Sequence, residues 1–417
     1  MTLPTCMRYA VDLFRQADTA SSAMAPASHP PRWAIPLVAG LAAPIGLYMT
    51  FIFLGAFPFF QRHFLYAHKI NTLFWHDVNK PEYWGFARNQ VTPFSLDTAD
   101  GESLFAWHIL PLPTYLRNED KLQAAPAGFS KDFAATESFK ILHDDPKARL
   151  VICFHGNAGH VAQGFRPGSY HTLTDTSTYH VLAIDYRGFG KSTGAPNEAG
   201  LINDGTAAVD WAINVAKVPP SRIVIMGQSL GTAVTSAVAE HYAMQGIEFA
   251  GVILVAGFSN LPTLLSRYTA GGVIPVLSPM RSIPPLLRFV QSFIVDKWRS
   301  SDRLSTVVGL TRTRLRLSLI HAKNDMEIPY SETDTLFRSA ASSLIGSELD
   351  DEDFAEWKKQ NTVLREDGTF VAEVKGDHDV IIREELVPYG GHNDVMLSSP
   401  VALAVMRSFG LHSEDAP

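Results

Sequence analysis

The 417-residue sequence has little charge, few cysteines and no block of basic residues. Charged residues make up 18% of the chain and the net charge is −7, which argues against nucleic acid as the main partner. The two cysteines, Cys6 and Cys153, lie near the N-terminus and inside an apolar run, so we expect no disulfide framework. Hydrophobic residues make up 46%, which excludes a disordered chain and provides a core for one large α/β domain or two medium ones.

Charge is absent altogether between Trp33 and Phe60. This run is longer than the roughly 20 residues that cross a hydrocarbon core, so we expect a transmembrane helix over 33–60, kinked at Pro44. A cleaved signal peptide would start nearer the N-terminus and have a shorter apolar core. A buried helix of a soluble protein would rarely lack charge for so long. Residues 1–32, rich in Ala, Ser and Pro, are expected to form a flexible N-terminal tail.

The following segment, 61–90, mixes aromatic residues with cations. Two interpretations remain open: a juxtamembrane segment in the headgroup layer, or a helix packed under the globular domain. Arg15 and Arg32 precede the apolar run and Arg62 and Lys69 follow it, so the positive-inside bias is close to a tie. The sequence has no N-x-[ST] sequon, so glycosylation gives no indication of a lumenal domain.

Residues 91–412 have the pattern of one α/β domain. Residues 91–110 predict two strands around an Asp-Gly turn, a hairpin signal. Further strands are predicted over 149–156, 180–188, 222–226, 251–255 and 316–321, with helices over 199–218 and 232–244. Strands that alternate with helices predict an α/β fold with a doubly wound, mostly parallel sheet.

Three stretches interrupt the alternation. Residues 111–147 are polar and irregular and predict an excursion between strands. Residues 261–312 are apolar but contain five prolines, and their place between two strands predicts a cap or lid insertion. Residues 346–388 begin with an acidic run, which predicts an inserted solvated loop or helix, with metal binding as the weaker alternative.

Gly227-Gln228-Ser229-Leu230-Gly231 fits the pattern G-x-S-x-G. A β-prone run precedes it and helix-forming residues follow it, which is the context of an exposed nucleophile on a strand-to-helix turn. Glycines on both sides of Ser229 remove the Cβ atoms that would clash in so sharp a turn. The pattern therefore predicts that Ser229 is a nucleophile, against the alternative of an ordinary turn.

A nucleophilic serine needs a histidine base and an acid, which follow it along the chain in the order acid, then histidine, on this fold. Asp325 stands at the end of a predicted strand and is the expected acid, with Glu327 as the alternative. His392 lies between the apolar run 380–389, read as the last strand, and a last helix that is capped by Ser398 or Ser399, and it is the expected base. His378, in an acidic turn, is interpreted as a surface histidine.

An oxyanion hole requires two backbone N–H groups aimed at the developing negative charge. Leu230, directly after the nucleophile, is one expected donor. Asn157, in the loop after the strand 149–156, is the other, with Ala158 as the fallback.

No cofactor and no metal are expected. His155 and His160 are five residues apart, a poor spacing for one helical face, which argues against a zinc site. Gly190-Lys191-Ser192 matches the last three positions of the phosphate-binding pattern G-x-x-x-x-G-K-S. The first position of that pattern requires glycine, and the chain has Asp185 there.

The motifs HGNAG, DYRGFGKS, GQSLG, HAKND and GGHND occur in this order. With them the chain resembles the α/β-hydrolase superfamily over residues 33–412. More narrowly, it is similar to the membrane-anchored monoacylglycerol and lysophosphatidylserine lipase group. The resemblance implies a Ser229, Asp325 and His392 triad, one N-terminal membrane helix and a place in the endoplasmic reticulum membrane. The 346–388 insertion departs from the compact form of the fold.

The expected function is hydrolysis of lipid esters of the monoacylglycerol or lysophospholipid type through an acyl-enzyme. One alternative keeps the chemistry and changes the substrate to thioesters of S-acylated proteins, with peptide-bond hydrolysis a weaker variant. Another is a non-catalytic membrane scaffold, although a scaffold has no need of all three residues in the correct order.

Overall fold

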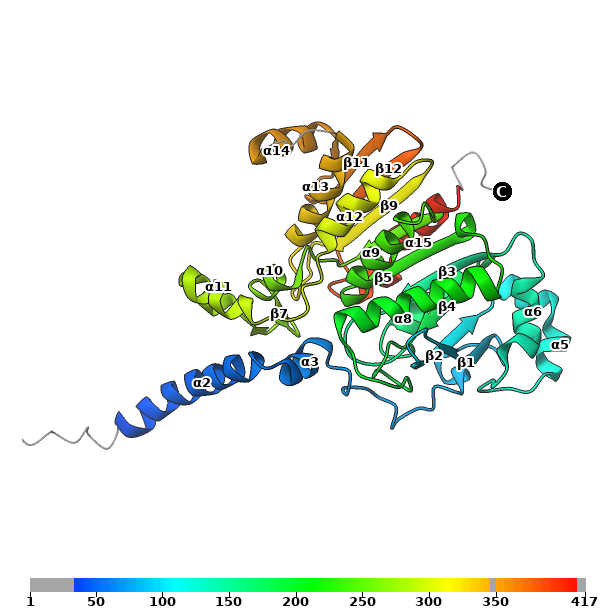
Figure 1. Ribbon diagram of the computed structural model, residues 1–417, viewed down its shortest axis with the longest axis horizontal. Coiled ribbons are helices and arrows are strands. Elements are labelled where there is room, and N and C mark those ends of the chain that lie inside the picture. Colours follow the sequence, from blue (N-terminus) through cyan, green and yellow to red (C-terminus); the bar gives the residue numbers. More distant parts are fainter. Residues whose placement is uncertain (1–33, 346–349, 411–417) are drawn as a thin grey trace, which may run out of the picture. The chain divides into compact units, whose positions relative to one another are not determined.

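The computed structural model describes residues 34–345 and 350–410. The chain forms two compact units, Met1–Leu54 and Gly55–Pro417 (Figure 1). The predicted flexible tail, residues 1–32, lies outside the described residues.

The apolar run predicted as one transmembrane helix over 33–60 forms two helices. Helix α2, Ala34–Gly55, continues through Pro44, and α3, Pro58–Tyr66, starts after a short break. Pro58 explains the break, because proline fits the first turn of a helix but disfavours helix in the residue before it. Among the described residues, no single helix is long and apolar enough to cross a membrane. Only the interrupted pair Ala42–Gly55 and Pro58–Tyr66 passes that test, and only by length and composition.

The second unit is built on a ten-stranded sheet of order β1-β2-β4-β3-β5-β6-β9-β12-β11-β10. Its strands are β1 Val91–Asp97, β2 Ser103–Ile109, β3 Arg149–Phe154, β4 Tyr179–Ile184, β5 Ile223–Gln228, β6 Gly251–Val255, β9 Leu315–Ala322, β10 Thr362–Leu364, β11 Phe370–Gly376 and β12 Val380–Val387. From β4 to β12 in this order the pairs are parallel, with antiparallel strands at both edges. The predicted hairpin and the mostly parallel sheet are confirmed.

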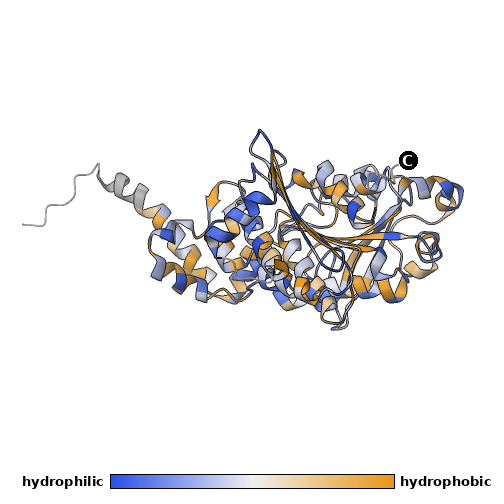
Figure 2. Cartoon of the chain, turned by 90° about the horizontal axis from the view of Figure 1, so that it is seen from above, coloured by the Kyte–Doolittle hydropathy of each residue, from blue (hydrophilic) through white to orange (hydrophobic). Residues whose placement is uncertain are grey.

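Helices cover both faces of the sheet. The helices of the two covering layers are α7 Arg166–Thr174, α8 Glu198–Asp210, α9 Leu230–Ala243, α12 Ser300–Leu310, α13 Ser331–Ile345 and α15 Ser399–Ser408. Helices α8, α9, α12 and α13 form one layer, and α7 and α15 pack on the opposite face (Figure 1). Figure 2 shows the sheet between these two layers, with apolar residues along its strands. The central strands are buried throughout, as parallel strands covered on both faces should be.

The predicted excursion, 111–147, contains three short helices: α4 Leu112–Arg117, α5 Glu119–Ala124 and α6 Glu137–His143. The predicted cap begins with α10, Leu261–Leu265, followed by the two-stranded β7 Thr269–Ala270 and β8 Ile274–Pro275, and by α11 Pro284–Ser292. The remainder of the predicted 261–312 segment is α12, which packs on α9 and α13 in the helical layer. Residues 300–310, which the sequence assigns to the predicted cap, therefore belong to the helical layer of the fold.

The acidic segment 346–388 is only partly an insertion. It contains α14, Asp351–Gln360, and the strands β10 and β11, which extend the sheet in antiparallel fashion. Its last part is β12, which pairs in parallel with β9 and belongs to the central sheet. This strand carries three charged residues. They are paired within the sheet region: Glu384 with Lys358, and Arg383 with Glu373 and Glu385.

Candidate active site

Ser229 lies on a strained turn between β5 and α9. Its φ is 53° and its ψ is −121°, a conformation that residues other than glycine seldom adopt and that is common at functional sites. A Cβ on Gly227 would stand 2.1 Å from the carbonyl oxygen of Gly231, and one on Gly231 would stand 2.0 Å from that of Phe154. Both glycines are therefore required by the close approach of backbones, as the sequence predicts.

The three predicted triad residues form one chain of hydrogen bonds. His392 Nε2 lies 2.9 Å from Ser229 Oγ, and His392 Nδ1 lies 2.8 Å from Asp325 Oδ2. Asp325 follows β9 and His392 follows β12, so the carboxyl ends of parallel strands bring them together with Ser229. Because a carboxylate can only accept, His392 donates from Nδ1 and presents an unprotonated Nε2 to the serine hydroxyl.

The side chain of Asp325 is buried and held by four donors. Its Oδ1 accepts the backbone N–H groups of Glu327 and Ile328 at 2.8 and 3.0 Å. Its Oδ2 lies 2.8 Å from His392 Nδ1 and 3.1 Å from His321 Nε2. Burial alone would raise the pKa of Asp325, but hydrogen bonds from His321 and His392 outweigh burial and hold that pKa well below its usual range. The carboxylate is therefore charged across the physiological pH range.

Neither alternative residue takes part in this chain. The carboxylate of Glu327 accepts a hydrogen bond from Tyr268 Oη at 3.1 Å. His378 lies in the exposed turn between β11 and β12, with a φ of 57°.

His321 is the functional neighbour that the sequence analysis missed. It is buried on β9, and its Nε2 faces two acceptors, Asp325 Oδ2 at 3.1 Å and the carbonyl of Ile328 at 3.0 Å. Its Nδ1 lies 2.7 Å from Thr333 Oγ1. The Nε2–H donor therefore helps to fix the acid. The available signal was its position in the same motif, four residues before Asp325.

Two amide side chains hold the His392 loop. Gln228 Nε2 donates to the carbonyl of His392 at 2.9 Å, and Asn324 Oδ1 accepts the N–H of Gly391 at 2.9 Å. Each stands directly beside a predicted triad residue, Ser229 or Asp325. The residues beside Ser229 and Asp325 thus position His392.

The loop after β3 lies against Ser229. A Cβ on Gly156 would stand 3.3 Å from Ser229 Cβ. The N–H of Ala158 donates to the carbonyl of Tyr66 at 2.9 Å, which rules out the fallback oxyanion donor. Asn157 and Leu230 are the two expected donors that remain.

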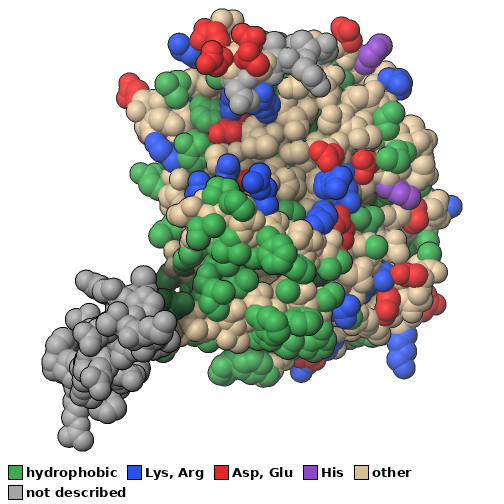
Figure 3. All heavy atoms as spheres, turned by 60° about the vertical axis from the view of Figure 1, so that its left-hand side comes forward, with side chains coloured by type: hydrophobic (Ala, Val, Ile, Leu, Met, Phe, Trp, Pro, Cys, Tyr) green, Lys and Arg blue, Asp and Glu red, His purple; other side chains and the backbone are tan. Residues whose placement is uncertain are grey.

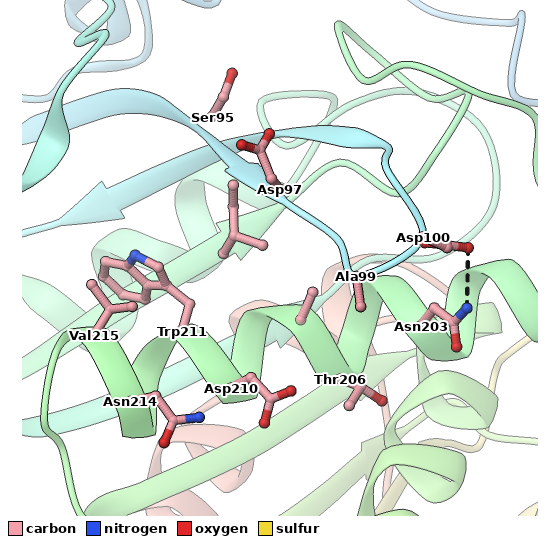
Figure 4. A pocket seen from close by; sticks show the side chains of 12 residues that line it. Ser95, Asp97, Ala99, Asp100, Asn203, Thr206, Asp210, Trp211, Asn214 and Val215 are labelled. Carbon is pink, nitrogen blue, oxygen red and sulfur yellow. Dashed lines mark hydrogen bonds between the residues drawn. The ribbon is translucent and has the colours of Figure 1, made fainter.

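The described residues contain no group of three or more His, Cys, Asp or Glu side chains arranged to hold a metal ion. His155 Nε2 lies 3.6 Å from Asp185 Oδ1, and His160 Nε2 lies 3.1 Å from Thr72 Oγ1. A separate hollow of about 620 Å³ opens between the β1–β2 turn and α8, with Asn203 hydrogen-bonded to Asp100 at its rim (Figure 4). None of the triad residues lines it.

Comparison with known proteins identifies the fold family. Residues 151–405, more than half of the chain, match the model of the alpha/beta hydrolase family. The chain belongs to the alpha/beta hydrolase family. A solved alpha-beta hydrolase from Vibrio vulnificus has a TM-score of 0.52 at 14% identity, covering 84% of this chain and 92% of its own, which supports the fold.

Among curated relatives, this alpha/beta hydrolase is 23% identical over 301 residues to the lysophosphatidylserine lipase ABHD12 of Danio rerio, covering 72% of this chain and 71% of the relative. It is 28% identical over 264 residues to the human protein ABHD12B, covering 63% and 65%. The chain thus spans just under two thirds of the human protein. These findings confirm the predicted fold and the resemblance to this group of hydrolases.

Proposed function

We propose that this protein is a membrane-anchored serine hydrolase that cleaves lipid esters of the monoacylglycerol or lysophospholipid type. The observation that carries the proposal is the unbroken hydrogen-bond chain from Ser229 through His392 to Asp325. A strained nucleophile, a correctly oriented base and a charged acid are the parts that acyl transfer requires. The lipase names of the ABHD12 relatives support a lipid ester as the substrate.

In this mechanism, His392 Nε2 accepts the proton of Ser229 as Oγ attacks the ester carbonyl. Asp325 keeps the imidazole in the required tautomer and stabilises the imidazolium that forms. The N–H groups of Asn157 and Leu230 stabilise the oxyanion of the tetrahedral intermediate. His392 then protonates the leaving alcohol, and water, activated by the same histidine, hydrolyses the acyl-enzyme and releases the fatty acid.

The outer surface around the cap suits a lipid substrate. Hydrophobic side chains gather over the cap and α3 (Figure 3). They include Val273 and Ile274 on the β7–β8 hairpin, Phe289 on α11 and Phe59 on α3, all more than half exposed. So large an exposed apolar area is typical of an interaction with a membrane or another apolar partner.

The apolar run 33–60 supports an N-terminal membrane anchor, by its length and its lack of charge. The endoplasmic reticulum as location rests on the resemblance to the membrane-anchored lipase group. Detergent-free membrane fractionation with carbonate extraction tests the anchor. Release of the full-length chain by carbonate would contradict it.

The substrate is tested with a panel of monoacylglycerol, lysophospholipid and acyl-cysteine peptide, each offered to the wild type and to Ser229→Ala. We expect ester hydrolysis by the wild type and at least a thousandfold loss in Ser229→Ala. Ser236→Ala, which changes a buried serine of α9 that donates to the carbonyl of Thr232, is the matched control. Preferred cleavage of the acyl-cysteine peptide would favour the thioesterase alternative. No acyl product from any substrate would favour the scaffold.

A further inference from the structure

One buried arginine donates hydrogen bonds to several backbone carbonyls of the loop beside Ser229. Arg166, the first residue of α7, is 7% exposed. Its Nη2 donates to the carbonyls of Gly156, Asn157 and Ala158 at 3.3, 3.1 and 2.9 Å. Its Nη1 donates to the carbonyl of His160 at 2.7 Å. A single guanidinium thus contacts four carbonyl oxygens within five consecutive residues.

The other side of this loop is bound by the end of α3 and the segment that follows it. Ala158 N–H donates to the carbonyl of Tyr66 at 2.9 Å, and Gly159 N–H donates to that of Ile70 at 2.8 Å. The side chains of Thr72 and His160 meet at 3.1 Å. The loop therefore has its carbonyls turned toward Arg166 and two of its amides turned toward residues 66–70.

This arrangement determines where the Asn157 amide points. In a trans peptide the C=O and N–H bonds point in opposite directions. The carbonyl of Gly156 accepts from His155 Nδ1 at 2.6 Å and from Arg166 Nη2 at 3.3 Å, so the N–H of Asn157, in the same peptide unit, faces away from both donors. Ala158 has a φ of 55°, a left-handed conformation that is unfavourable for a residue with a side chain, so contacts of the loop must hold it there.

Tyr66 also connects the loop to the cap side of the site. Its hydroxyl donates to Asp296 Oδ2 at 2.6 Å and accepts from Trp298 Nε1 at 3.3 Å. Both partners lie in the stretch that leads from α11 to α12. The end of α3 is therefore packed between the loop 156–160 and the stretch that leads from α11 to α12.

We propose that Arg166 is a positioning residue for hydrolysis, and that it clamps the loop 156–160 against residues 66–72 so that the Asn157 N–H points at the oxyanion. The proposal rests on the proposed function. It makes the segment after α3 a working part of the active site rather than a linker. A lysine cannot replace Arg166, because its ammonium is a point donor without the planar fork that reaches several carbonyls at once.

The test uses full-length Arg166→Lys and Arg166→Met. Fluorophosphonate titration counts the competent sites in each preparation. We then measure kcat per titrated site, KM, and the Ki of a long-chain trifluoromethyl ketone. That ketone forms a tetrahedral oxyanion with the serine, so its binding reports the oxyanion hole. We expect kcat to fall roughly tenfold in Arg166→Lys and about a hundredfold in Arg166→Met, with KM within about threefold and Ki raised in proportion to the loss of kcat.

Arg187→Lys is the matched control. Arg187 is similarly buried, but its guanidinium pairs with Asp204 and Asp100 instead of the loop. We expect this variant to lose stability while kcat per titrated site stays at the wild-type value. The same outcome in both Arg166 variants, lower stability with unchanged kcat and Ki, would overturn the proposal.

If the Arg166 variants yield no folded protein, the same measurements are made on Thr72→Val instead. It removes the hydroxyl beside His160 and should lower kcat about threefold to tenfold with a matching rise in Ki. An unchanged kcat and Ki in Thr72→Val would overturn the clamp. A wild type that neither hydrolyses ester nor reacts with fluorophosphonate would overturn the proposed function itself, and the clamp with it.

Discussion

Replacing Gly231 with alanine should disable the site by separating two backbones. The new Cβ would stand 2.0 Å from the carbonyl oxygen of Phe154 and 2.9 Å from that of His155. An ordinary contact begins near 3.4 Å, so the start of α9 and the end of β3 must move apart by roughly 1.4 Å. Neither obstacle is a flexible side chain, and Gly231 does not have a positive φ, so the effect is purely steric.

The displaced strand end leads into Gly156 and Asn157, while α9 carries Leu230 and follows Ser229. A misplacement of about 1 Å at reacting groups costs on the order of a hundredfold in rate. We therefore expect Gly231→Ala to lower kcat/KM at least a hundredfold. The free energy of unfolding should fall by about 3 kcal/mol, the upper end of overpacking penalties. Ester hydrolysis per titrated site and urea unfolding measure the two effects.

Gly309→Ala is the control for this substitution. Gly309 lies in α12, and a Cβ there would meet nothing within 4 Å. Alanine should leave hydrolysis unchanged and stabilise the helix by about 0.4 to 1 kcal/mol. Wild-type activity and stability in Gly231→Ala would refute the close-approach reasoning.

Three further predictions concern buried groups. Asp325→Asn removes the charge that orients His392 and should lower kcat about 10⁴-fold with the fold retained, whereas a loss below tenfold would contradict its role. Because the folded state lowers the pKa of Asp325, its charge stabilises the fold above about pH 4, and this stabilisation is lost as pH falls through the lower folded pKa. The urea midpoints of wild type and Asp325→Asn should therefore differ fully at pH 7 and converge only in stronger acid; a constant difference would contradict the pKa shift. Burial raises the pKa of Cys153 to about 12, so its thiol should not react with maleimide at pH 8 in the native protein. In a Cys6→Ser background, where Cys153 is the remaining thiol, we expect reaction after the protein is unfolded. Rapid native labelling would contradict that burial.

Local patterns predicted the parts of the site that depend on local structure. The elbow around Ser229 follows from a β-prone run, two glycines and a helix start within a dozen residues. Asp325 and His392 could be predicted from their places after strands, because the ends of parallel strands meet at one edge of the sheet. Ala158 could not be excluded in this way, since its N–H is taken by a carbonyl 92 positions earlier, that of Tyr66.

The predicted ends of the segments 261–312 and 346–388 differ from the observed elements for physical reasons. β12 carries Arg383, Glu384 and Glu385, whose ion pairs within and beside the sheet make a charged strand compatible with burial. α12 follows a proline-rich stretch, and only its packing on α9 and α13 separates it from the cap. Such contacts join segments distant in the chain, so hydropathy and spacing do not reveal them.

The central claim is that Ser229 is the nucleophile that His392 activates. Its most direct test is reaction of the full-length protein with a fluorophosphonate, followed by mass spectrometry of the peptide that contains Ser229. We predict one adduct per chain, on Ser229, with no adduct in Ser229→Ala and normal labelling in Ser236→Ala. An adduct on another residue, or undiminished labelling of Ser229→Ala, would contradict the account.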